Sequence, residues 1–67
     1  MKKKYVAQIT ENEKSVSYEI EGWGTSAQDF HKTVLFEHIK YPQEEILYIF
    51  NDSGKKVFNL KRGFSAG

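Results

Sequence analysis

The sequence predicts a small α+β domain with the element order ββαββ, in which one helix crosses one face of a four-stranded antiparallel sheet. Three observations predict this fold. Two pairs of alternating apolar segments are typical of hairpins, a helical segment lies between them, and 67 residues leave room for one domain. We expect residues 1–67 to form that single domain, with residues 1–3 and 63–67 loose at its ends.

The first hairpin is predicted from alternation over residues 4–10 and 16–21, which a polar segment separates. A two-residue turn at Asn12-Glu13 pairs Ile9 with Val16. This register puts all the apolar partners of both strands on one face, as a half-buried hairpin requires. The apolar residues on that face are Tyr5, Ala7, Ile9, Val16, Tyr18 and Ile20.

The helix is predicted over residues 27–40. The Gly22-Trp23-Gly24 segment is expected to break the preceding strand, and Ser26 or Thr25 to cap the helix. Proline at position 42 disfavours the helical conformation in the residue before it, so the helix should end there. Spacing at 100° per residue gives one apolar stripe of Ala27, Phe30, Val34, Leu35 and Ile39.

The second hairpin combines residues 45–51 with residues 57–60. A three-residue loop at residues 52–54, with Gly54 at a positive φ, pairs Ile49 with Val57 and Tyr48 with Phe58. If this hairpin lies beside the first strand, the sheet order is 2-1-3-4. The helix should then cover the face that carries Tyr5, Tyr18, Ile20, Tyr48 and Phe58.

The strand over residues 46–50 is apolar on both faces, and one helix can cover only one of them. The other face should therefore be buried by a partner. This argument favours a non-enzymatic protein-interaction module, regulatory or adaptor in kind, that self-associates through the sheet face opposite the helix. The residues predicted for this interaction are Val6, Leu47, Ile49, Val57 and Phe36, the last because it falls on the polar side of the helix.

An alternative is a nucleic-acid-binding module. The predicted topology gathers cations, one indole and the start of the helix at one end of the sheet, where phosphates and bases could be held. The residues concerned are Lys2, Lys3, Lys4, Trp23, Lys55 and Lys56. Against this alternative, terminal lysines also serve solubility, and Trp23 could belong to the core.

We find no pattern that indicates catalysis. His31 and His38 lie seven residues apart, and no further ligand or nucleophile has the spacing of a metal or catalytic site. Both are expected at the edge of the core. We therefore expect no enzyme activity, cofactor, metal or small-molecule substrate.

The net charge of +1 creates no overall field toward nucleic acid or membrane, and no segment is long and apolar enough to span a bilayer. With no cysteine in the chain, a cytoplasmic location is expected. The composition suits a small regulatory protein of a low-GC bacterium or its phage.

Overall fold

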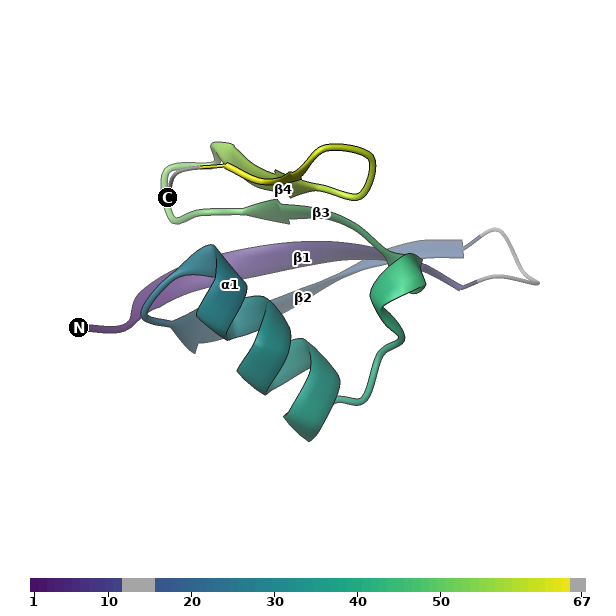
Figure 1. The fold of residues 1–67 in the computed structure, drawn as a ribbon, viewed down its shortest axis with the longest axis horizontal. Coiled ribbons are helices and arrows are strands. Elements are labelled where there is room, and N and C mark those ends of the chain that lie inside the picture. Colours follow the sequence, from purple (N-terminus) through teal and green to yellow (C-terminus); the bar gives the residue numbers. More distant parts are fainter. Residues whose placement is uncertain (12–15, 66–67) are drawn as a thin grey trace.

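The computed structural model describes residues 1–11 and 16–65. Its described part contains one antiparallel sheet in the order β2-β1-β3-β4-β5 (Figure 1). The strands are β1 (Lys3–Glu11), β2 (Val16–Gly24), β3 (Ile46–Phe50), β4 (Lys56–Asn59) and β5 (Gly63–Phe64). The α+β class and the order of the four predicted strands are thus confirmed.

The fifth strand corrects the expectation that residues 63–67 are loose. Gly63, with φ of 81°, turns the chain back so that β5 pairs with β4. The amide of Ser65 then donates to the carbonyl of Val57 at 2.8 Å. Residues 66–67 lie outside the described residues.

The helical segment starts as predicted and winds differently. Helix α1 (Ala27–Asp29) continues directly as a π-helix, η1 (Phe30–His38), and a short 3-10 helix, η2 (Gln43–Glu45), precedes β3. The amide of Ile39 donates to the carbonyl of Val34 at 2.9 Å, and Lys40 takes a left-handed φ of 62°. This change of backbone conformation ends the helix before Tyr41-Pro42.

The helical segment packs against β1 and β2 and leaves the opposite sheet face uncovered (Figure 1). Phe30 is fully buried and stacks on Tyr5, with the ring centroids 5.6 Å apart. The buried apolar core is Tyr5, Ala7, Ile9, Ala27, Phe30, Leu35, Ile46, Ile49, Val57 and Phe58.

The winding of η1 changes which residues face the core. A π-helix closes its hydrogen bonds five residues apart instead of four, so the apolar stripe rotates along the helix. His31 is buried at 4% exposure, as expected for a residue at the edge of the core, whereas Ile39, predicted in the stripe, is 37% exposed. His38 is exposed, so only His31 of the two histidines lies at the core.

In the first hairpin Ile9 pairs with Tyr18 and Glu11 with Val16, a register two residues away from the predicted one. The predicted turn at Asn12-Glu13 lies outside the described residues. A shift of two keeps every side chain on its predicted face, which is why the core positions of this hairpin are still correct.

The Gly22-Trp23-Gly24 segment belongs to β2 and does not break it. Its glycines allow the helix to approach the strand. A Cβ at Gly22 would lie 2.6 Å from Cε2 of Phe30, and a Cβ at Gly24 would lie 2.8 Å from the backbone nitrogen of Phe30. The glycines thus serve helix–sheet packing, a use that the sequence pattern did not distinguish from a turn.

The second hairpin departs from the predicted register through a β-bulge. Phe50 pairs with Lys56 as predicted, but Ile49 pairs with Phe58, so Val57 is an extra residue in β4. A one-residue shift exchanges the two faces of everything beyond it. Ile49 therefore lies on the core face with Phe58, and Tyr48 lies on the uncovered face.

A second register shift, between β1 and β3, explains the two-faced appearance of β3. Gln8 pairs with Tyr48 but Ile9 pairs with Ile46, so Leu47 is extra on that side. As a result Ile46 and Ile49 both reach the core, and the strand does not bury two faces.

Candidate binding face

The sheet face opposite the helix, which we call the outer face, differs in composition from the predicted one. Ile49 and Val57, expected there, are both 0% exposed and belong to the core. Val6 lies on the outer face and is half-buried, and Leu47 is also half-buried. Tyr48 and Phe50, which the sequence analysis did not assign to this face, take the places of Ile49 and Val57.

The strand registers arrange the outer face in rows that cross four strands. One row runs Glu21, Val6, Phe50, Lys56, because Val6 pairs with both Glu21 and Phe50, and Phe50 pairs with Lys56. The adjacent row runs Glu19, Gln8, Tyr48 and Asn59. Each row therefore has a carboxylate at the β2 end, and its aromatic ring lies on β3.

Local contacts hold the long side chains over this face. The ammonium of Lys56 lies 4.0 Å from the centroid of the Tyr48 ring, in cation–π geometry. Lys4 and Glu21 form an exposed ion pair with an N–O distance of 3.5 Å. A shallow depression of about 370 Å³ opens between these rows and the β3–β4 turn, lined in part by Val6, Glu19 and Phe50.

Trp23 lies at the end of β2, 59% exposed and directly opposite Lys4. The question whether this indole belongs to the core is thus answered: it lies on the outer face. The register brings Lys3 and Lys4 to the same end of the sheet as Lys56, where Lys55 precedes β4. The predicted gathering of lysines and indole at one end of the sheet is present.

The helix start, by contrast, is closed by its own chain. The hydroxyl of Ser26 accepts from the amide of Asp29 at 3.1 Å, and the Asp29 carboxylate accepts from the Thr25 amide at 2.9 Å and from the Thr33 hydroxyl at 3.3 Å. The bonds to its carboxylate, that from the Thr25 amide first, hold the pKa of Asp29 below its usual value. A carboxylate at this position repels a phosphate, which argues against the phosphate contact predicted for the helix start.

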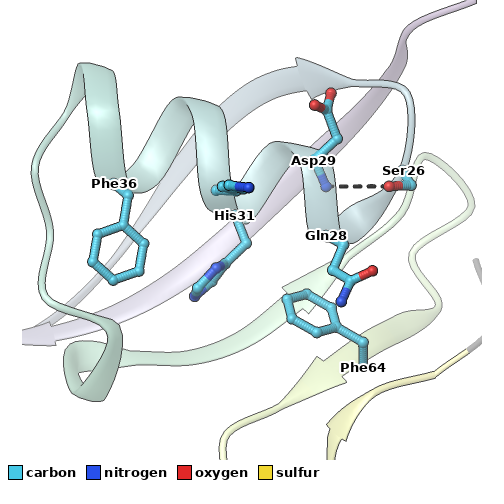
Figure 2. A pocket seen from close by; sticks show the side chains of 7 residues that line it. Ser26, Gln28, Asp29, His31, Phe36 and Phe64 are labelled. Carbon is cyan, nitrogen blue, oxygen red and sulfur yellow. Dashed lines mark hydrogen bonds between the residues drawn. The ribbon is translucent and has the colours of Figure 1, made fainter.

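A second concavity lies on the helix side of the sheet. It is an open pocket of about 560 Å³ between the helical segment and β5. Figure 2 shows side chains that line it. The His31 ring lies between Phe36 and Phe64, with both ring-centroid distances 5.3 Å, and 5.5 Å from Phe58. Nε2 of His31 is buried without a hydrogen-bond partner among the described residues.

Burial among these rings lowers the pKa of His31, which favours the neutral imidazole. No group of three or more histidine, cysteine, aspartate or glutamate side chains in residues 1–11 and 16–65 is arranged to hold a metal ion. The imidazole therefore packs as a flat, largely apolar group, in agreement with the core role expected for it.

Phe36, predicted as an interaction residue on the polar side of the helix, lies apart from the outer face. It belongs to η1 and contacts His31 on the helix side of the sheet, whereas Val6 lies on the outer face. Phe36 is 40% exposed, but it cannot contribute to a contact made by the outer face.

Comparison of the chain with protein-family models, with curated proteins and with solved structures found no match. None of the helices in the described part of the chain is long and apolar enough to cross a membrane. The arrangement of the outer face is thus the basis for any functional assignment.

Proposed function

We propose that this chain is a non-enzymatic protein-interaction module that binds a second copy of itself through the outer face. The observation that supports the proposal most strongly is the row Glu21, Val6, Phe50, Lys56. Read across the sheet it is acidic, aliphatic, aromatic and basic. Rotation about a two-fold axis parallel to the strands, between β1 and β3, reverses the row and makes it complementary to itself.

In this dimer Glu21 of one copy meets Lys56 of the other, and Val6 meets Phe50. The adjacent row behaves in the same way, because Glu19 then meets Asn59 and Gln8 meets Tyr48. Stacked sheets lie about 10 Å apart, so side chains from both copies interdigitate. The contact buries the half-buried aromatic rings and leaves the charged residues at its rim, as specific interfaces do.

The size of the face predicts a weak dimer. Four strands about 4.8 Å apart and about seven residues long offer roughly 400–500 Å² per copy. The total of roughly 1,000 Å² lies at the low end of specific interfaces, so we expect a dissociation constant in the micromolar range.

Charge reversal tests the proposed pairing. Glu21→Lys or Lys56→Glu alone places like charges together at both symmetric contacts, and each should weaken the dimer about ten-fold. The double variant Glu21→Lys/Lys56→Glu restores opposite charges and should recover most of the affinity. Sedimentation equilibrium measures all three constants.

Glu37→Lys and Lys32→Glu are matched controls, because both residues are exposed on the helix side of the sheet. They should leave the dissociation constant unchanged. A double variant no better than the single ones would contradict the proposed face-to-face pairing.

A second candidate function is single-stranded nucleic-acid binding, which the exposed Trp23 opposite Lys4 favours. Each lysine that contacts a phosphate should add about 0.7–0.9 to the slope of log affinity against log salt. Trp23→Ala should cost about 1–3 kcal/mol of binding and hardly change that slope. Titration with a random oligonucleotide at two salt concentrations, including Lys55→Ala/Lys56→Ala and a melting control, tests this candidate.

The absence of cysteine is consistent with a reducing cytoplasm, which we propose as the compartment for either function.

A further inference from the structure

Strand β2 forms a long open edge of the sheet. It contains nine residues, Val16–Gly24, and is the terminal strand, so none of the described strands pairs with its side away from β1. In an antiparallel pair, alternate residues direct their backbone N–H and C=O groups away from the partner strand. The β1–β2 register has no bulge and β2 has no proline, so two common protections of an edge are missing.

The side chains of β2 give this edge a negative charge. Its outer-face residues are Ser17, Glu19, Glu21 and Trp23, all exposed, and β2 itself carries no cation. On the helix side, Val16 is 49% exposed and Ile20 is half-buried. A strand added here would meet carboxylates on one face and apolar side chains on the other.

Two β2 strands fit each other poorly in the registers where they overlap most. If the nine residues of two β2 strands pair fully antiparallel, Glu19 faces Glu21 of the other copy at two positions. Displacing the register by two residues sets Glu19 against Glu19 or Glu21 against Glu21. Like charges directly opposite disfavour the pairing in each of these registers.

We infer that β2 binds an extended segment of a different protein, in which lysine or arginine alternates with apolar residues. The segment would extend the sheet by one strand, with its cations opposite Glu19 and Glu21 and its apolar side chains beside Val16 and Ile20. The backbone bonds of this contact lie at the edge of the sheet, whereas its cations share Glu19 and Glu21 with the proposed self-association through the outer face.

The test uses an acetylated, amidated nine-residue peptide in which lysine alternates with valine. Two further versions carry N-methyl groups on the backbone. One is methylated on the backbone nitrogen of every lysine, and the other on the backbone nitrogen of every valine. All three have the same charge, but each methylated version loses the backbone donors on one side of the strand. Calorimetry measures affinity, and emission of Trp23, the single tryptophan, reports contact at β2.

We expect one methylated peptide to bind like the unmethylated one and the other to bind at least ten-fold more weakly. Equal binding of all three would show charge attraction alone and overturn the inference, and so would no binding of the unmethylated peptide. Glu19→Lys should weaken the lysine peptide at least five-fold and strengthen a glutamate–valine peptide, whereas the control Glu37→Lys should do neither. Equal effects of both variants would also contradict the edge site. Sedimentation of the same samples reports the face-to-face dimer separately.

Discussion

Replacing Gly22 by alanine introduces a methyl group where the helix meets β2. The added Cβ would lie 2.6 Å from Cε2 of Phe30 and 3.1 Å from Cγ1 of Val34, and the Phe30 ring is fully buried. Overpacking of this kind costs about 1–3 kcal/mol of unfolding free energy. Phe30→Leu removes the ring edge that the methyl group contacts and should by itself cost about 1 kcal/mol. The double variant should therefore be more stable than the sum of the single effects by about 1 kcal/mol or more.

Gly24→Ala is the matched control for this cycle. Its Cβ would lie 2.8 Å from the backbone nitrogen of Phe30, so shortening the Phe30 side chain cannot relieve the contact. Urea unfolding followed by far-UV circular dichroism, at one low protein concentration, gives all the free energies. Additive effects for Gly22→Ala with Phe30→Leu, or equal coupling for both glycines, would refute the described packing of the helix on β2.

Three further predictions concern the core and the helix start. Because burial lowers the pKa of His31, the unfolded chain binds more protons than the folded one below about pH 6.5, and stability falls as the pH drops through that value toward the folded pKa. Melting at pH 7.5 and pH 5 should show a smaller loss for His31→Leu than for the parent, and equal losses would contradict the burial of the imidazole. Ile49→Lys buries an unpaired charge and should unfold the chain, which far-UV circular dichroism would detect. A cooperative melt near the parent's would contradict the burial of Ile49 in the core. Ser26→Ala removes the hydroxyl that accepts from Asp29 and should cost about 1 kcal/mol in urea unfolding, and no change would argue against the cap.

Patterns that depend on local periodicity were predictable from the sequence. The first hairpin kept its faces because its register error was an even number of residues, and Ser26 caps the helix as expected. The turn before β4 has Gly54 at φ of 78°, as predicted for its glycine. The strand order followed from short connections without crossings.

The composition of the outer face was not predictable, because it depends on a single inserted residue. Asn51 holds the β3–β4 turn by accepting from the amides of Ser53 at 3.0 Å and Lys55 at 2.9 Å, so the predicted pairing is correct at Phe50. The bulge at Val57 then exchanges the faces. Both faces of β3 are apolar, so nothing in its sequence distinguishes Tyr48 from Ile49 as the residue that faces the core. The π-helical winding of η1 was not predictable either, because the spacing of its apolar residues was interpreted with the periodicity of an α-helix.

Contact between Val6 of one copy and Phe50 of another is the central feature of the proposed dimer. An isotope-filtered NOE spectrum of a mixture of labelled and unlabelled chains measures it directly, because the filter removes the intramolecular neighbours. At protein concentrations where sedimentation shows dimers, we expect intermolecular NOEs between the Val6 methyl groups and the Phe50 ring. A filtered spectrum without these NOEs, or a chain that stays monomeric at millimolar concentration, would contradict the proposal.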